Sequence, residues 1–166
     1  MSGADDRVRE ARFLAARGRG AEALAEVESV LDDWPQHLPA LLLKAALLQQ
    51  AGAAESSLAL YERAVGLAPA SAEAWNERAR CLHALGRDDE ALEAARQARA
   101  LLSLPANAAH WAAVHLTLLW CLREKRLLRE ALEAAEEALA RTPDAVIAEW
   151  ASQVEQELAE AERERC

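Results

Sequence analysis

The residues best suited to metal binding or nucleophilic chemistry are three cysteines and four histidines. Cys81, Cys121 and Cys166 form no CxxC pair, and none stands at metal-ligand spacing from a histidine. His110 and His115 are five residues apart and have no acidic or thiol partner at ligand spacing. We therefore predict neither a metal site nor a cofactor.

Catalysis requires a nucleophile beside a base, paired carboxylates in an apolar setting, or a glycine loop that cradles phosphate. The glycines of this chain fall where helices are expected to end. Acidic residues such as Glu133, Glu136 and Glu137 fall on the side of a predicted helix that faces solvent. The sequence contains no recognisable catalytic constellation, and we do not expect an enzyme.

The charge balance argues against a nucleic-acid partner. Nineteen basic and 28 acidic residues give a net charge of −9 and a pI near 5.0, so the molecule as a whole repels a phosphate backbone. The densest basic cluster, Arg-Glu-Lys-Arg at 123–126, contains an acid and lies at a predicted helix end, where cations favour the helix dipole.

The sequence also lacks targeting and membrane signals. Residues 1–6 have neither the basic nor the apolar run of a secretory signal, and no stretch reaches the roughly 20 apolar residues that a membrane span needs. An odd number of cysteines fits a reducing compartment better than a disulfide framework. We predict a cytoplasmic protein without membrane insertion.

The elements that position all these residues are expected to be helices. Hydrophobic residues make up 52% of the 166-residue chain and aromatic residues only 4%. Alanine and leucine dominate, whereas β-branched residues are scarce. This balance favours helices over strands.

One short pattern recurs along the chain. It reads GRGAEAL at 18–24, GAAESSL at 52–58 and GRDDEAL at 86–92, so successive copies are 34 residues apart. A fourth copy, RLLREAL at 126–132, follows after 40 residues. The period predicts a repeat architecture with six additional residues between the third and fourth units.

Each copy predicts a pair of helices. A first helix of about 13 residues runs to the glycine, which adopts the left-handed conformation that ends a helix. The second helix carries small residues at helical spacing, such as Ala91, Ala95 and Ala98, and this stripe allows a neighbouring helix to approach closely. Prolines such as Pro35 and Pro69 follow the second helix and end the pair.

The third unit carries the clearest family resemblance. In order, its tryptophan, small residue, large residue, turn glycine and two alanines are Trp75, Ala79, Leu82, Gly86, Ala91 and Ala98. The chain thus resembles the tetratricopeptide repeat family over roughly residues 4–143. The resemblance implies an all-α fold, an alpha-alpha superhelix of four helix-turn-helix repeats with a C-terminal capping helix.

The expected organisation is one domain over residues 1–166. We predict repeats at about 4–37, 38–71, 72–105 and 112–145, an insertion at 106–111, and a capping helix at about 144–165. The second helix of the third unit should end near Leu102, and the next helix should start near Asn107 as its cap and be longer at its front. The capping helix covers the apolar face that a stack of helices leaves open.

Several positions depart from the family pattern. Arg7 and His115 stand in place of tryptophan, Ser57 in place of alanine, Arg126 in place of the turn glycine and Ser103 in place of the closing proline. Cys81 and Cys121 occupy equivalent positions where the family has a small residue, so we interpret them as size substitutes for alanine.

In this family the first helices of successive pairs line a concave groove that holds an extended peptide or a partner helix. The resemblance implies that the groove-facing residues here are Arg12, Leu42, Gln49, Gln50, Asn76, Arg80, His83, Leu116, Trp120 and Arg123, together with Val8, Ala15 and Ala46. Arginine and tryptophan most often anchor interfaces, because one offers five donors and the other a large apolar face. The alternative is that Trp120 fills the core and the arginines are solvated.

Some family members grip a C-terminal carboxylate from this face. Asn76 and Arg80, one helical turn apart, supply only part of such a clamp, since Leu116 and Trp120 in the following unit cannot donate to a carboxylate. His83 makes binding pH-sensitive if it meets a carboxylate, and is otherwise polar surface.

Two functions follow from these patterns. The first is an adaptor or co-chaperone-like module that binds a peptide or helix of a partner protein in its groove. The alternative is a structural protein that assembles with itself through the insertion, Trp111 and the terminal helix.

Overall fold

The computed structural model describes residues 3–102 and 108–164. Over these residues the chain forms helices and no strands, which confirms the predicted all-α class. The helices are α1 (Gly3–Ala16), α2 (Gly20–Asp33), α3 (Leu38–Gln50), α4 (Ala54–Leu67), α5 (Ala72–Ala84), α6 (Asp88–Ala100), α7 (Ala108–Glu124), α8 (Leu128–Arg141) and α9 (Ala145–Arg163).

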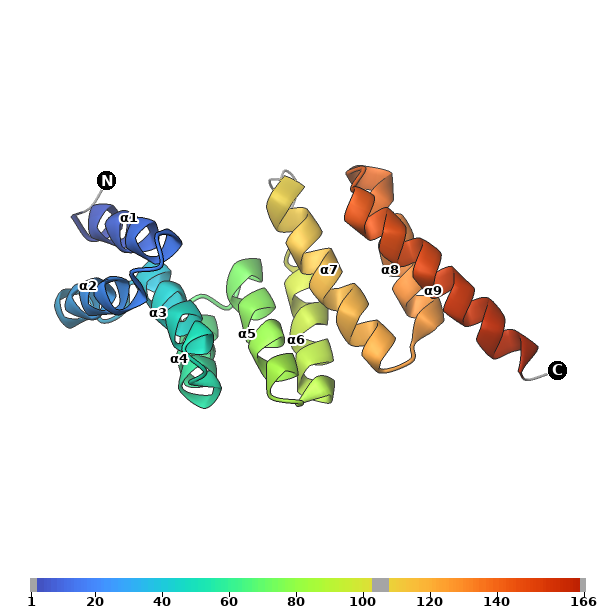
Figure 1. The fold of residues 1–166 in the computed structure, drawn as a ribbon, viewed down its shortest axis with the longest axis horizontal. Helices are drawn as coiled ribbons and strands as arrows, with labels where there is room; N and C mark the ends of the chain where they lie inside the picture. Colours follow the sequence, from blue (N-terminus) through green and yellow to red (C-terminus); the bar gives the residue numbers. More distant parts are fainter. Residues whose placement is uncertain (1–2, 103–107, 165–166) are drawn as a thin grey trace.

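Consecutive helices pack as pairs, and the pairs follow one another in a row (Figure 1). The first helices of successive pairs also contact each other: α1 with α3, α3 with α5, α5 with α7, and α7 with the terminal helix α9. The predicted helical solenoid is therefore confirmed, with α9 closing its end. Because the first helices lie side by side, residues one repeat apart in sequence come together on one face.

The start of α7 carries the additional residues between the third and fourth units. α7 has 17 residues, whereas α5 has 13, as expected for a helix lengthened at its front. The predicted cap Asn107, Ser103 and the first two residues of the predicted insertion lie outside the described residues. The remaining four, 108–111, form the first turn of α7, and α6 ends at Ala100, slightly before the predicted Leu102.

The turns inside the pairs use the left-handed backbone conformation. Gly18, Gly52 and Gly86 have φ angles of 75°, 83° and 71°. Arg126 takes the same conformation, with φ 57°, in the fourth pair. Arg126 therefore replaces the glycine of the family pattern without changing the backbone conformation of the turn.

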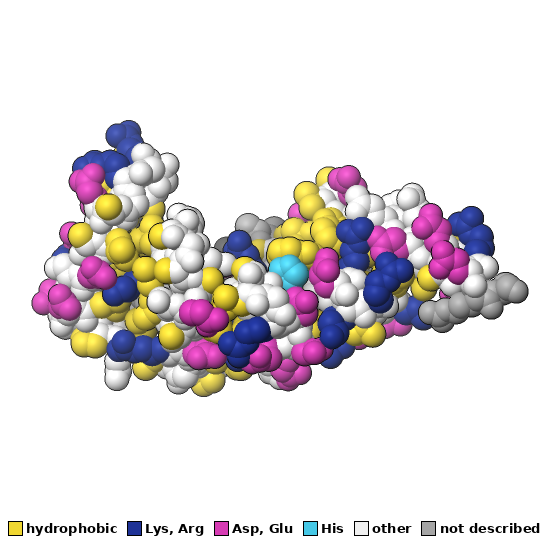
Figure 2. Space-filling model, turned by 60° about the horizontal axis from the view of Figure 1, so that its bottom comes forward, with side chains coloured by type: hydrophobic (Ala, Val, Ile, Leu, Met, Phe, Trp, Pro, Cys, Tyr) yellow, Lys and Arg dark blue, Asp and Glu magenta, His cyan; other side chains and the backbone are white. Residues whose placement is uncertain are grey.

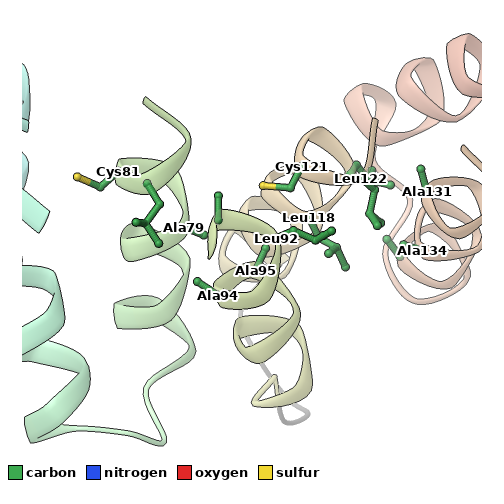
Figure 3. Packing of buried hydrophobic residues seen from close by; sticks show 14 of the residues in the cluster. Ala79, Cys81, Leu92, Ala94, Ala95, Leu118, Cys121, Leu122, Ala131 and Ala134 are labelled. Carbon is green, nitrogen blue, oxygen red and sulfur yellow. The ribbon is translucent and has the colours of Figure 1, made fainter. Parts of the chain in front are cut away.

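The core between the helices is built largely from alanine. On α6, Ala91, Ala95 and Ala98 are fully buried, so the small-residue stripe lies where helices meet. The close view in Figure 3 shows α6 beside α7, with Leu118 and Leu122 nearby and Ala131 and Ala134 of α8 on the far side. Small side chains here set the close spacing of the helices.

Both described cysteines are buried in this core. Burial raises the pKa of the Cys81 thiol and raises that of Cys121 to about 11, so both remain protonated at neutral pH. Cys81 Sγ lies 3.4 Å from the carbonyl oxygen of Ala54. These properties suit the interpretation of both residues as substitutes for alanine, while Cys166 lies outside the described residues.

Polar contacts account for some departures from the family pattern. The Arg7 guanidinium donates to Glu26 at 2.7 Å, Asp33 at 3.1 Å and Ser29 at 2.7 Å, and so ties α1 to α2. The Ser57 hydroxyl is fully buried and donates to the carbonyl oxygen of Ala45 at 2.8 Å. The Ser57 bond satisfies a buried hydroxyl that would otherwise be costly in the core.

Candidate protein-binding groove

One face of the molecule is hollowed between the N-terminal helices and the C-terminal half, and hydrophobic side chains gather on one side of the hollow (Figure 2). Four cavities lie along the first helices. The first cavity is lined by Asp5, Val8, Arg9, Arg12 and Pro39. The second cavity is lined by Arg12, Leu42, Leu43, Ala46, Tyr61, Glu73 and Glu77. The third cavity is lined by Ala46, Gln49, Gln50, Tyr61, Glu77 and Arg80.

The fourth cavity lies between α5, α7 and α9 and measures about 310 Å³. We call it the aromatic cavity. It is lined by Asn76, Arg80, Ala113, Leu116, Thr117, Trp120, Val146 and Trp150. Trp120 is 38% exposed and Val146 is 50% exposed, so much of this apolar surface faces solvent.

The four cavities share lining residues. Arg12 belongs to the first and second, Tyr61 and Glu77 to the second and third, and Arg80 to the third and fourth. They therefore form one strip from α1 to α9, which we call the groove. Its lining combines polar side chains in the N-terminal part with apolar ones at the C-terminal end.

Most of the predicted site residues line this groove. Ten do so, whereas the predicted Ala15 does not: Val8, Arg12, Leu42, Ala46, Gln49, Gln50, Asn76, Arg80, Leu116 and Trp120. Leu42 is only 6% exposed and forms part of the floor of the groove, whereas Arg80 is exposed at its edge. Arg80 and Trp120, from helices one unit apart, line the same cavity.

His83 and Arg123 do not line the aromatic cavity, but each contacts one of its tryptophans. The His83 ring packs against Trp120 with centroids 3.9 Å apart, and its Nδ1 is 2.9 Å from an Asp88 oxygen. Arg123 donates from Nε to Glu157 at 2.7 Å and lies 5.1 Å above the Trp150 ring. Both predicted residues thus support a tryptophan of the cavity.

The sequence prediction missed the contribution of α9. Val146 and Trp150 line the aromatic cavity, although the apolar pattern of their helix predicted only a cap over the solenoid end. Tyr61 of α4 and Glu73 and Glu77 of α5 were also missed. The spacing of Glu77 and Arg80, three residues apart, was the one available signal, since it predicts an ion pair on one helix face.

Ion pairs compensate several of the charges beside the groove. Arg80 Nη1 donates to both Glu77 carboxylate oxygens at 3.1 Å. Arg12 and Glu73, which line the second cavity, form no ion pair with any described residue. The N-terminal part of the groove therefore presents one cation and one carboxylate that have no ion partner among the described residues.

Two buried polar groups in the groove lining lack partners. Asn76 is 3% exposed and its Oδ1 accepts no hydrogen bond, while its Nδ2 lies 3.3 Å from a Glu77 oxygen. The Tyr61 hydroxyl is also buried without a partner, and burial raises its pKa above the ordinary value. Such unpaired groups are uncommon in folded proteins because burial removes water from them.

Residues 8–72 and 42–105 each match the family model for the tetratricopeptide repeat, and together these matches cover more than half of the chain. The chain belongs to the tetratricopeptide repeat family. The tetratricopeptide fold makes it, in general terms, a protein–protein interaction module, and proteins of this family are generally non-enzymatic repeat scaffolds. The comparison with curated proteins gives no match.

Solved structures of other tetratricopeptide proteins share the fold of this chain. PilF of Pseudomonas aeruginosa aligns with a TM-score of 0.83 at 16% identity, covering 95% of this chain and 69% of PilF. MamA aligns with a TM-score of 0.72 at 18% identity, covering 92% of this chain and 81% of MamA. YrrB, described as having an unusual peptide-binding site, aligns with a TM-score of 0.67 at 17% identity, covering 89% and 74%.

Two other kinds of site are absent from the described part of the chain. None of its helices has the length and apolar character needed to cross a membrane. Within residues 3–102 and 108–164, no three histidine, cysteine or acidic side chains are grouped so as to hold a metal ion.

Proposed function

We propose that the tetratricopeptide groove holds a segment of a partner protein, and that the chain acts as an adaptor or co-chaperone-like module. The observation that carries this proposal is the continuity of the groove, whose cavities share Arg12, Tyr61, Glu77 and Arg80. A continuous strip along side-by-side helices suits a peptide or a helix better than a small molecule. The aromatic cavity supplies the apolar anchor that interfaces commonly need.

The composition of the groove supports a segment with two kinds of contact. An apolar residue fills the aromatic cavity, and polar residues face Arg12 and Glu73, which have no ion partner among the described residues. A complete carboxylate clamp is not proposed. Leu42, Ala46, Leu116 and Trp120 stand at the equivalent positions of the neighbouring units, and none of them supplies a further cationic side chain for a carboxylate.

Affinity capture from native lysate tests this proposal. The double variant Arg80→Glu, Trp120→Ala should lose most partners recovered by wild type, because truncating an interface anchor commonly costs about 2 kcal/mol or more, roughly 30-fold in affinity.

The matched control is Arg129→Glu, Leu127→Ala, which makes the same kinds of change away from the groove. Leu127 is 39% exposed, close to the 38% of Trp120. Equal recovery of partners by wild type and the groove variant would refute the proposal, and so would an equal loss with both variants.

Self-assembly remains the alternative prediction. Its motivating residue, Trp111, is 3% exposed and lies under Arg141, whose guanidinium carbon is 4.9 Å from the ring centroid. Trp111 therefore offers little surface to a second copy. Light scattering over a concentration series distinguishes the two functions, since a strict monomer at high concentration removes this alternative.

A further inference from the structure

Phe13 of α1 occupies a position that is buried in every later pair. Five residues before the turn, the second, third and fourth pairs have Leu47, Cys81 and Cys121, and all three are buried. Cys81 shows what covers this position, since its Sγ lies 3.4 Å from the carbonyl oxygen of Ala54 in the second helix of the preceding pair. Phe13, the equivalent residue of α1, is 51% exposed.

The exposure of Phe13 follows from the place of α1 in the row. No helix precedes α1 in the described part of the chain, and α1 lies at one end of the row (Figure 1). Only Arg17 covers the ring, with its guanidinium carbon 4.6 Å from the ring centroid. Single exposed apolar residues are ordinary on protein surfaces. What distinguishes Phe13 is that it lies on the face by which later helices pack, and that charges flank it.

Two charges without ion partners lie on the same stripe of α1 as Phe13. Glu10 is three residues before it and Arg17 four residues after it, so the three side chains share one helix face. Arg17 directly follows α1, and its backbone N–H donates to the carbonyl oxygen of Phe13 at 3.3 Å. Both charged residues are exposed, and neither forms an ion pair with any described residue. The stripe therefore carries, in order, an acid, an aromatic ring and a base.

We infer that two copies of the chain associate through this stripe, with their α1 helices antiparallel about a two-fold axis. The axis passes between the two Phe13 rings. Glu10 of each copy then faces Arg17 of the other copy, because the two charges lie on opposite sides of Phe13. A parallel arrangement would place Glu10 opposite Glu10, and like charges across an interface are unfavourable. The charge order is self-complementary in the antiparallel arrangement, as a two-fold interface requires.

The pairing surface is separate from the groove and from the far end of the row. Glu10, Phe13 and Arg17 line none of the four groove cavities, so the inference does not depend on the proposed function. The terminal helix α9 carries five glutamates and one arginine. It would attract Arg17 but repel Glu10, so a second α1 matches the stripe better than α9 does.

Sedimentation equilibrium of the full chain at micromolar to millimolar concentrations tests the pairing. One helix from each copy provides less than the roughly 1,600 Å² that a standard interface buries, so we expect a dimer that dissociates at about micromolar concentrations or above. Phe13→Ser should weaken association by about 30-fold or more, because it removes the central anchor. The matched control Leu67→Ser, at an exposed position of α4, should associate as wild type does.

Charge reversal tests the antiparallel order. Glu10→Arg places an arginine opposite Arg17 of the second copy, and Arg17→Glu places a glutamate opposite Glu10. Each variant alone should dimerise about tenfold more weakly than wild type. An equal mixture of the two variants should recover dimerisation, because every arginine then faces a glutamate. Recovery in the mixture also shows that both variants are folded.

A wild-type chain that stays monomeric at millimolar concentration would overturn this inference. Association that is unchanged in Phe13→Ser would also overturn it, since another surface would then hold the copies together. A third contrary result is a mixture of the two charge variants that associates no better than either variant alone.

Discussion

Arg126 holds a backbone conformation that the other three turns give to glycine. Its φ of 57° lies in the left-handed region, which costs a residue with a side chain roughly 1–2 kcal/mol. Its ion pair with Glu157, at 3.4 Å and 68% exposed on the arginine side, returns little of that cost. We infer that the packing of α7 against α8, the two helices that flank the turn, holds Arg126 in this unfavourable conformation.

We expect Arg126→Gly to raise the free energy of unfolding by about 1 kcal/mol, because glycine adopts this conformation without strain. The converse change, Gly86→Ala, should lower the free energy of unfolding by a similar amount, because a φ of 71° strains an alanine backbone. An added Cβ would meet no atom within 4 Å, so no steric clash adds to this cost. Urea denaturation measures both. A destabilised Arg126→Gly protein would show that the arginine side chain, and not its backbone, matters at this turn.

At the scale of the element, α7 carries a buried titratable group among three helices. His115 is fully buried, and its Nδ1 lies 3.0 Å from the carbonyl oxygen of Trp111. Burial lowers the pKa of His115 in the folded protein. Arg99 of α6 and Arg141 of α8 act in the same direction, while Glu137 of α8 and the Trp111 carbonyl oppose it.

Because the folded pKa lies below the unfolded value of about 6.5, the unfolded chain binds the proton more readily. Stability is thus retained above pH 6.5 and falls below it, by up to about 1.4 kcal/mol per pH unit from this group. In His115→Leu this contribution should disappear. We expect the difference in unfolding free energy between wild type and variant to change between pH 7.5 and 5.5, and a constant difference would contradict the assignment.

The elements were largely predictable from sequence, and their contribution to the site only in part. The 34-residue period marks the helix pairs because glycine and alanine meet steric demands that recur in every unit. The apolar pattern of α9 likewise predicts a capping helix, and in the structure Ile147, Ala151 and Val154 of this pattern are buried. Periodicity indicates which face of a helix is apolar, but not how far a residue at its edge, such as Trp150, reaches into a cavity shared with α5 and α7.

On the scale of the whole molecule, the solenoid converts residues distant in sequence into one surface. Arg12 and Val146 lie at opposite ends of the chain and line the same groove through the cavities between them. The second helices carry the outer acidic residues and several ion pairs between units, such as Arg96 with Glu130 at 2.7 Å. Under the proposed function, the first helices thus bind the partner and the second helices cover the outer face.

Site-specific photocrosslinking in living cells tests this division of faces most directly. A photoreactive amino acid is placed in the groove, at Gln50 or Ala113, or at the exposed positions Glu93 of α6 or Glu133 of α8. We predict adducts with another protein from Gln50 and Ala113 and none from Glu93 and Glu133. Adducts confined to Glu93 and Glu133 would contradict the groove as the binding surface.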